Sequence, residues 1–495
     1  METKDIVQNS VRFVKSIEPG LCELCGQKNT HRNWCNSCYA KLFQEQAVNW
    51  TSGNHDVDEF ILQAQIDAKS YFEVIEWIPY ENFSNIQYLA KGGYGEVYLA
   101  YWDEGVITCW SDEFKDWFRD SKKVILKSLF DSKNKIKEFL DELRLQVRSF
   151  DTAGTLGITP CFGITRNPKD GNFMMVMEYG PGGSLRKYLD KKFKILVWHK
   201  KLDILCDIIR GILSIHRAGL THRDLHGGNI VMDKNYTRIT DFGLSKLVVK
   251  ESSSKKNKIF GVLPFVAPEV LCGNDYNKPA DIYSFGIIMN EMATGIPPFN
   301  DIPHDSGLAL RIMNGLRPNI NKELTPQLII DLIKQCWDDV PEKRPTAEIL
   351  VEILCKMKDE SILNTTELYK QIKVIEKSIE LDQKILDVKD SSITYETHPQ
   401  AVYKSRPLEI NKSSKINSEP TIESSLMDLV STLLFWPLDK HIRKFATLSR
   451  YNTRGNGRNF SCFIYDGIEE MRTDAHEKFS DVRTVHYRYA IQMFG

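Results

Sequence analysis

The stretch "LTHRDLHGGNIVMD", residues 220–233, places His222, Arg223 and Asp224 in consecutive positions, and Asn229 follows five residues after the aspartate. Apolar runs flank this polar group, so we expect its residues to lie on a loop. The stretch proves little by itself, and its interpretation depends on the residues that precede and follow it.

A second acidic loop follows in "TDFGLSK", where Asp241 comes twelve residues after Asn229. Carboxylate and amide oxygens are the ligands that Mg²⁺ uses together with phosphate oxygens. We therefore predict that Asp241 is the main Mg²⁺ ligand and that Asn229 holds a second ion. Asp224 would then be available to accept a hydrogen bond from an incoming hydroxyl group.

A glycine-rich stretch upstream, "LAKGGYGEVYLAY" at residues 89–101, places Gly92 and Gly95 in a turn between two strand-like pieces. Glycine lets backbone N–H groups approach phosphate oxygens closely, although an ordinary hairpin turn would also use it. Lys127 then ends the strand-like "KVILK", and Glu142 lies in a stretch with helical spacing. Such a pair would hold the lysine ammonium against the phosphates of a nucleotide.

These motifs in this order resemble a eukaryotic-type protein kinase over residues 85–357. The resemblance implies an α+β fold with two lobes, a small five-stranded sheet lobe and a large helical lobe. The chain agrees with this order, because strand-like pieces come first and helix-like pieces follow. The implied reaction transfers the γ-phosphoryl group of ATP to a hydroxyl group of a protein, with Mg²⁺ bound.

The resemblance assigns roles to particular residues. Lys127 and Glu142 would grip the nucleotide, Asp224 would position and deprotonate the acceptor hydroxyl, and Asn229 and Asp241 would hold Mg²⁺. The residues that it places at the ATP site are Ala90, Gly92, Gly93, Gly95, Val97, Ile125, Lys127, Glu142, Met177, Glu178, Gly180 and Val231. The structural positions that it implies are Glu269, Arg344 and Asp281.

Four positions depart from the family pattern. Ala90 replaces the first loop glycine, and Ile125 stands where a small alanine usually lies above adenine, so its bulk would narrow the pocket. His226 and Val262 replace a lysine and a threonine that contact each other in many serine/threonine kinases. The chain looks closest to the tyrosine-kinase-like group, which favours serine/threonine acceptors over tyrosine or dual specificity. The alternative function is a pseudokinase scaffold or adaptor, for which Ile125 is the main argument.

A regulatory switch is expected near the active loops. Arg223 precedes the catalytic aspartate, and in kinases such an arginine often binds a phosphate on the activation segment, here residues 244–266. Ser252, Ser253 and Ser254 lie in this segment beside lysines. A phosphate there would add about two negative charges for Arg223 to pair with. A solvated polar loop is the other interpretation.

Four cysteines near the start form a pattern typical of a metal site. Cys22, Cys25, Cys35 and Cys38 make two CxxC pairs with a short spacer. Two such turns place four thiolates around one tetrahedral Zn²⁺, with no position left open for catalysis. The pattern predicts a structural zinc site, with a redox pair or free thiols as the alternatives, and His31 is a possible but unneeded ligand.

The domain organisation follows from these motifs and from changes in periodicity. Apolar residues at four/three spacing after the kinase region predict an amphipathic helix, which we expect to dock on its own domain rather than form a coiled coil. The expected parts are an N-terminal segment 1–20, a zinc segment 21–45, a connecting helix 46–84, the kinase 85–357, the amphipathic helix 358–395, a linker 396–425 and a tail 426–495 of unknown role.

The composition limits the possible partners. The 495 residues carry a net charge of -1 and are 42% hydrophobic, which gives no reason to expect nucleic acid as a partner. No apolar run is long enough to span a bilayer, and no secretory signal is recognisable. We expect a cytoplasmic protein, with a nuclear location left open. Its expected partners are a protein substrate and a protein bound through the zinc segment or the C-terminal helix.

Overall fold

The structure, a computed structural model, describes most of the first 408 residues. The residues described are 19–91, 95–111, 113–149, 157–233, 236–243, 246–247, 259–386 and 393–408. Four groups of predicted features lie outside this part of the chain: Gly92 and Gly93, Ser252 to Ser254, the second half of the expected linker, and the tail.

The small lobe is built on a mixed sheet in the order β1-β5-β6-β4-β3-β2. The sheet therefore has six strands in the described chain, where the sequence predicted five. The sixth strand, β1, pairs in parallel with β5 at the edge of the sheet. The bounds are β1 Glu76–Trp77, β2 Phe83–Lys91, β3 Gly95–Ser111, β4 Asp116–Leu129, β5 Cys161–Arg166 and β6 Phe173–Glu178.

The predicted connecting helix is shorter than the sequence suggested. Helix α3 spans His55–Asp67, and the chain then enters strand β1. Val74, Ile75 and Ile78 are all buried, but each belongs to a different apolar cluster. A helix presents its apolar residues on one face only, so side chains that point into three clusters require an extended backbone. We interpreted the apolar spacing of this whole region as helical. Its second half is not helical and leads into strand β1.

Alternation along β4 separates the two faces of this sheet. Val124 and Leu126 are fully buried in one cluster, while Ile125 packs against the other. Helix α3 and helix α4, Ile136–Ser149, cover the face with Ile125. Because side chains alternate along a strand, Lys127 lies on the same face as Ile125 and points toward α4.

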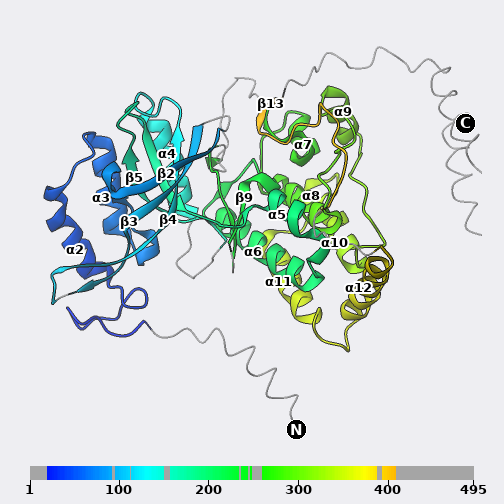
Figure 1. Cartoon of the computed structure of the whole chain (residues 1–495), viewed down its shortest axis with the longest axis horizontal. Coiled ribbons are helices and arrows are strands. Elements are labelled where there is room, and N and C mark those ends of the chain that lie inside the picture. Colours follow the sequence, from blue (N-terminus) through cyan, green and yellow to red (C-terminus); the bar gives the residue numbers. More distant parts are fainter. Residues whose placement is uncertain are drawn as a thin grey trace, which may run out of the picture. The chain divides into compact units, whose positions relative to one another are not determined.

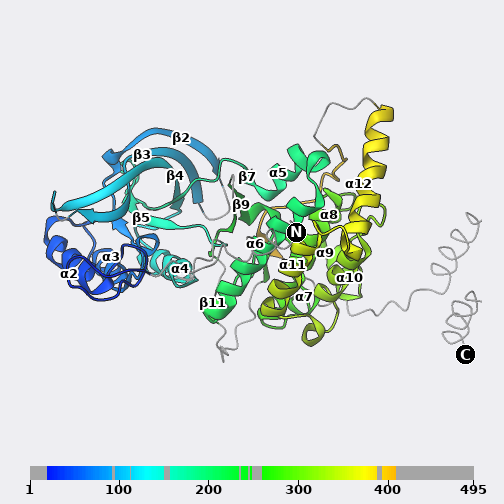
Figure 2. The same ribbon diagram turned by 90° about the horizontal axis from the view of Figure 1, so that it is seen from below.

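The zinc segment packs on a long extension of the β3–β4 hairpin. Helix α2, Asn36–Gln46, carries the last cysteine of the cluster, Cys38, and lies beside α3 and the sheet (Figures 1 and 2). Trp34 is fully buried, and its ring stacks on that of Trp117 in β4, with centroids 5.9 Å apart. The indole N–H of Trp117 donates to the side chain of Gln46 at 3.0 Å. This segment is therefore joined to the small lobe through a shared aromatic core.

The second lobe is mainly helical and encloses the largest apolar core. Helices α6 and α8 supply about half of its fully buried side chains. The helices are α5 Leu185–Lys192, α6 Trp198–Arg217, α7 Pro268–Leu271, α8 Lys278–Thr294, α9 Ser306–Met313, α10 Gln327–Cys336, α11 Ala347–Glu360 and α12 Glu367–Leu386. The short strands are β7 Gly183–Ser184, β8 Leu220–Thr221, β9 Ile230–Met232, β10 Thr237–Ile239, β11 Lys246–Leu247, β12 Ile259–Gly261 and β13 Arg406–Leu408.

The amphipathic helix docks on its own domain. Leu368 and Ile372 of α12 belong to the core cluster of the helical lobe and are 0% and 2% exposed. Figure 2 shows α12, in yellow, along this lobe, where the Gln371 side chain accepts from the backbone N–H of Leu328 at 3.5 Å. Burial of these residues against the lobe matches the expected docking face rather than a dimeric coiled coil.

The first part of the expected linker is not a linker. Residues 393–408 run over the helical lobe, and β13 at their end pairs antiparallel with β12 (Figure 1). Sequence patterns did not predict this, because an extended segment held by main-chain hydrogen bonds needs no apolar periodicity. Only the part of the expected linker after residue 408 lies outside the described chain.

No helix within the described residues has the length and apolar character needed to cross a bilayer.

Candidate active site

The cleft between the lobes gathers three charged side chains from distant parts of the chain. The ammonium of Lys127 on β4 lies 2.7 Å from Oε1 of Glu142 on α4 and 3.0 Å from Oδ1 of Asp241. The exposed fractions of these side chains are 12%, 10% and 35%, so the carboxylate of Asp241 faces solvent most. One cation thus links the sheet, its helix and the loop that begins at Asp241.

Burial and charge act in opposite directions on these groups. Burial alone would lower the pKa of Lys127, but the carboxylates of Asp241 and Glu142 outweigh it and hold that pKa above the usual lysine range. Burial would likewise raise the pKa of Asp241, and the neighbouring Lys127 ammonium holds it below its usual value. Lys127 and Asp241 are therefore both charged at neutral pH.

The loop that carries Asp224 is held from below by Asp281 near the start of α8. Its carboxylate accepts the backbone N–H of His222 at 2.9 Å and that of Arg223 at 3.0 Å. His216 also lies 2.9 Å from it. Arg223 has a positive φ of 73°, a conformation that costs a non-glycine residue energy unless its surroundings impose it. The hydrogen bonds to Asp281 impose it and aim Asp224 into the cleft.

Asn229 joins the two acidic loops. Its side-chain amide donates to the backbone carbonyl of Asp224 at 3.0 Å and to Oδ2 of the same residue at 3.3 Å. Its backbone carbonyl accepts the N–H of Thr240, the neighbour of Asp241, at 3.0 Å. Oδ1 of Asp224 is buried and has no hydrogen-bond partner among the described residues. Two carboxylates and an amide oxygen in this arrangement are a donor set that suits Mg²⁺ and a phosphate-bound substrate.

Several residues predicted to border adenine lie on neighbouring strands. Ile125 pairs in register with Met177, which is 3% exposed. Gly180 lies so close to Val231 of β9 that an added Cβ would be 2.1 Å from its side chain. Only glycine fits so close to β9, and this contact brings the chain after β6 against the helical lobe.

The glycine loop is described only at its two ends. Ala90 pairs with Val97, and Val97 pairs in turn with Lys127. A Cβ on Gly95 would lie 1.8 Å from the carbonyl oxygen of Ser128, so this glycine is required by close packing on β4. The described ends of this stretch, Ala90 and Gly95, therefore lie beside the strands that carry Val97 and Lys127.

From the sequence, Glu178 was placed at the ATP site, but its side chain was given no role. Its carboxylate lies 3.0 Å from the ammonium of Lys122 and 2.6 Å from the guanidinium of Arg238 on β10. The pair with Arg238 joins Glu178, at the end of β6, to the helical lobe. Arg238 is 60 residues from Glu178 and carries no motif, so no sequence signal pointed to it.

The predicted structural pair lies in the helical lobe. Arg344 makes two hydrogen bonds to the carboxylate of Glu269, at 2.7 and 2.8 Å, and its side chain is fully buried. A bidentate pair of this kind fixes both partners in orientation as well as distance. It fastens the end of the activation segment to the core.

One of the unusual positions, His226, lies beside Asp224, and another, Val262, lies in the core of the helical lobe. The Nδ1 atom of His226 accepts the backbone N–H of Gly228 at 3.0 Å, and its Nε2 atom lies 3.8 Å from Oδ2 of Asp224. Val262 is buried in the apolar core. The imidazole of His226 therefore lies beside Asp224, at the position where many serine/threonine kinases carry a lysine.

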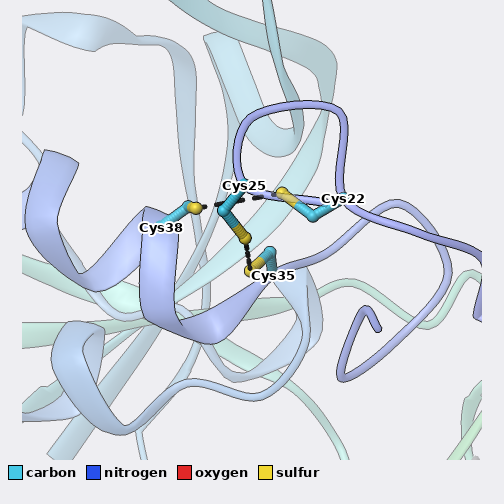
Figure 3. A group of neighbouring side chains, drawn as sticks. All are labelled: Cys22, Cys25, Cys35 and Cys38. Carbon is cyan, nitrogen blue, oxygen red and sulfur yellow. Dashed lines mark hydrogen bonds between the residues drawn. The ribbon is translucent and has the colours of Figure 1, made fainter. Parts of the chain in front are cut away.

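The four cysteines form one compact cluster away from the cleft (Figure 3). The sulfur atoms of Cys22 and Cys38 are 3.8 Å apart, as are those of Cys25 and Cys35, and all four lie within 4.8 Å of one another. Zn–S bonds of about 2.3 Å at tetrahedral angles would separate the sulfur atoms by about 3.8 Å. The geometry fits a tetrahedral ion. His31 instead packs edge-on against the rings of Tyr71 and Phe72.

The family model for protein tyrosine and serine/threonine kinases matches residues 83–354, which is more than half of the chain. The chain belongs to this family.

Curated relatives agree with this assignment over the kinase region. The chain is 31% identical to the serine/threonine-protein kinase VIK of Arabidopsis thaliana, over 56% of this chain and 60% of that protein. It is 27% identical to the dual specificity protein kinase splA of Dictyostelium discoideum, over 60% of this chain and 12% of that protein. It is 31% identical to the mitogen-activated protein kinase kinase kinase mkh1 of Cytospora mali, over 58% and 15%. The chain thus spans less than two thirds of these relatives.

Proposed function

We propose that this chain is an active protein kinase that transfers the γ-phosphoryl group of ATP to serine or threonine hydroxyls of proteins in intracellular signalling. The observation that carries the proposal is the contact of one ammonium, Lys127, with both Glu142 and Asp241. This arrangement brings the two lobes together around the place where the phosphates of ATP would bind.

The chemistry would consist mainly of positioning and charge compensation, because the transition state of phosphoryl transfer is loose. Lys127 would bind the α- and β-phosphates, with Glu142 fixing its direction. Asp224 would orient the acceptor hydroxyl through Oδ1, its unpartnered oxygen, and receive its proton. Asn229 and Asp241 would hold Mg²⁺, which when bound supplies positive charge to the phosphate oxygens.

Substitution of Asp224 by asparagine tests the central role. Asp224→Asn should lower kcat by at least about a hundredfold, because a general base contributes about 10² to 10⁴ in rate. The unfolding temperature should not fall, since the amide has the same shape and a buried carboxylate is lost. Transfer of phosphate to casein with labelled ATP measures the first effect, and unchanged transfer would refute the role.

For the acceptor we propose serine or threonine. Two observations support this choice: the name of the relative VIK, a serine/threonine-protein kinase, and the resemblance to the tyrosine-kinase-like group, which includes His226 and Val262. Phosphoamino-acid analysis of labelled casein decides the question. Phosphotyrosine as the main product would overturn the specificity, while leaving the proposed kinase activity in place.

A pseudokinase scaffold is the second candidate, and Ile125 is the observation that favours it. This side chain lies opposite Met177 in the strand pair that borders the adenine pocket. A pocket too narrow for adenine would leave a kinase fold that only binds proteins. Thermal shift with Mg·ATP separates the two candidates, because a scaffold of this kind would show no stabilisation by nucleotide.

We also propose that the cysteine cluster holds a structural Zn²⁺. The separations of the sulfur atoms support this, and four sulfur ligands leave no open coordination position for catalysis. The ion would fix two turns that are otherwise supported by the aromatic core shared with the hairpin and by hydrogen bonds to residues 66–69. Metal analysis of the purified full chain should find one zinc per molecule, and less than about half would count against the site.

For regulation we propose that a phosphate on Ser252, Ser253 or Ser254 pairs with Arg223. The Nε of Arg223 donates to Thr221 at 3.2 Å, and its guanidinium lies 5.6 Å from the ring centre of Tyr276, beside strand β12. This position next to the activation segment supports the proposal. Phosphopeptide mapping of active protein would refute it if none of the three serines were modified.

The proposed partners are a protein substrate and a protein bound through the zinc segment or α12. The apolar faces of both elements are largely used within the chain, so such a partner would have to use what remains exposed, such as Leu21 and Val374, each 71% exposed. Nucleic acid remains an unfavoured partner, and a cytoplasmic location remains a prediction.

A further inference from the structure

Residues 393–408 are anchored to the helical lobe by specific hydrogen bonds. The backbone N–H of Val402 donates to Nδ1 of the buried His304 at 3.1 Å, and the backbone N–H of His304 donates to the carbonyl of Gln400 at 3.0 Å. The guanidinium of Arg406 donates to the carbonyl of His304 at 2.6 Å, and the hydroxyl of Tyr403 donates to Pro298 at 2.9 Å. The segment therefore has a fixed path rather than a loose one.

This path ends beside the proposed catalytic aspartate. Strand β13 pairs with β12, with Leu408 opposite Ile259 and Arg406 opposite Gly261. A Cβ built on Gly261 would lie 3.6 Å from Oδ1 of Asp224, so β12 passes directly along this carboxylate. The segment thus occupies the edge of the activation segment that lies nearest the site of phosphoryl transfer.

The register places one hydroxyl at the end of this strand pair. Because β12 and β13 are antiparallel, Ser405, which precedes Arg406, lies next to the residue after Gly261. The Oγ atom of Ser405 is buried and has no hydrogen-bond partner within the described residues. Oδ1 of Asp224 is likewise buried and without a partner there. A buried polar atom without a partner is uncommon in a folded protein. Here a buried donor and a buried acceptor without partners flank the same glycine.

The other hydroxyl groups of residues 393–408 are either hydrogen-bonded or exposed to solvent. Those of Tyr395 and Tyr403 are hydrogen-bonded to the helical lobe, to Asp190 and Pro298. Thr394 and Thr397 are exposed to solvent. Ser405 is therefore distinguished from its neighbours by burial without a partner and by its place in the register.

We infer that Ser405 is an intramolecular phosphorylation site, at which the C-terminal segment acts as a substrate of its own kinase domain. The inference rests on the proposed function. Oγ of Ser405 forms a bond to the γ-phosphorus of ATP, and the bond from that phosphorus to the β–γ bridging oxygen breaks, so that ADP leaves. The hydroxyl proton passes to the carboxylate of Asp224 and then to solvent. The modified serine carries about two negative charges.

The test is incubation of the purified full chain with Mg·ATP over a wide range of protein concentrations, followed by phosphopeptide analysis. Ser405 should be labelled with a first-order rate constant that does not change on dilution, since donor and acceptor sites lie in one molecule. Ser405→Ala should lose this phosphopeptide, and Thr397→Ala, in the same segment, should keep it. Arg406→Ala should lower the rate constant about tenfold, because a hydrogen bond from a charged group is lost.

Casein is labelled in parallel by the wild-type chain, so that the two proposals fail in different ways. Labelled casein with unmodified Ser405 would overturn this inference and leave the kinase activity standing. A rate constant that rises with protein concentration would also overturn it, because the transfer would then run between molecules. No transfer to either acceptor would overturn the proposed kinase activity and this site with it.

Discussion

Lys127 and Glu142 face each other across the small lobe, with the Nζ and Oε1 atoms 2.7 Å apart and both side chains nearly buried. The contact joins β4 to α4, so the position of the helix determines whether the lysine is aimed into the cleft. A helix that moved away would leave the ammonium paired with Asp241 alone, at the oxygen that Mg²⁺ would need.

Glu142→Gln tests this relationship. Removal of one carboxylate should let Lys127 turn toward Asp241 and lower kcat/KM about a hundredfold, the usual loss when one charge-stabilising contact is removed. Steady-state kinetics with casein as acceptor measures the change. Glu138→Gln, an exposed acid one turn earlier on α4, is the matched control and should change kcat/KM less than about twofold. Equal losses in both variants would show a general effect on the helix.

Ile125→Ala should strengthen ATP binding. A shorter side chain opposite Met177 widens the pocket, and a change of one or a few methyl groups in an apolar pocket alters binding by at least about threefold. The KM for ATP should therefore fall. Ile125→Leu keeps the volume and should leave the KM within about twofold. A higher KM in the alanine variant would mean that Ile125 packs on adenine instead of obstructing it.

Cys35→Ser should release the metal and destabilise the small lobe. Loss of a structural ion is among the few single changes that cost more than about 4 kcal/mol. The zinc content and the urea unfolding curve of the full chain measure both effects. Cys272→Ser, an exposed cysteine outside the cluster, should change neither. Full zinc content in the Cys35 variant would contradict four-sulfur coordination.

Trp117→Ala should separate the zinc segment from the hairpin. Trp117 is 8% exposed and contacts the rings of Trp34, Tyr39 and Phe43, so its loss should cost about 3 kcal/mol or more in unfolding free energy. Phe118→Ala removes the next residue, whose side chain is 50% exposed, and should stay within about 0.5 kcal/mol. Similar losses in both variants would contradict the shared aromatic core.

The attachment of residues 393–408 to the helical lobe should become less stable as the pH falls. Burial lowers the pKa of His304 below 6.5, its ordinary value, although the carbonyls of Val402 and Phe299 partly oppose this. Arg406 lowers this pKa further and Asp305 raises it. The neutral ring accepts the N–H of Val402, so the unfolded chain binds the proton more readily than the folded one.

The stabilisation from His304 should therefore be complete above pH 6.5 and decline progressively below it. Thermal unfolding of the wild type and of His304→Gln, followed from about pH 7.5 down to about pH 5.5, measures the difference. The two curves should converge as the pH falls. Curves that stayed parallel would show that this histidine does not titrate differently on folding.

The arrangement of the proposed catalytic residues was predictable because short motifs determine local geometry. The stretch from His222 to Asn229 is a single tight turn, and Asp241 follows it after one small hairpin, so sequence spacing largely fixes their separation. Lys127 and Glu142 are farther apart in the chain, and their contact was foreseen through the family resemblance rather than from the residues.

Features that depend on distant main-chain pairing were not predictable. Strand β1 has two residues and pairs with β5, whose sequence lies more than eighty residues later. Residues 393–408 bind through backbone groups and a few side chains such as Arg406, which requires no particular composition. The aromatic contact of Trp34 with Trp117 likewise joins two segments that carry no shared motif.

The aromatic core beneath the cysteine cluster has a consequence for biosynthesis. Trp34 and Phe43 leave the ribosome about 75 to 85 residues before Trp117, an interval of roughly 4–17 s at ordinary translation rates. During that time the proposed metal ion and the hydrogen bonds to residues 66–69 are what order the cysteine turns, since the hairpin is not yet made. Cells short of zinc should therefore make a chain whose first module reaches its partner strand unformed, and the yield of soluble kinase should depend on zinc supply during translation.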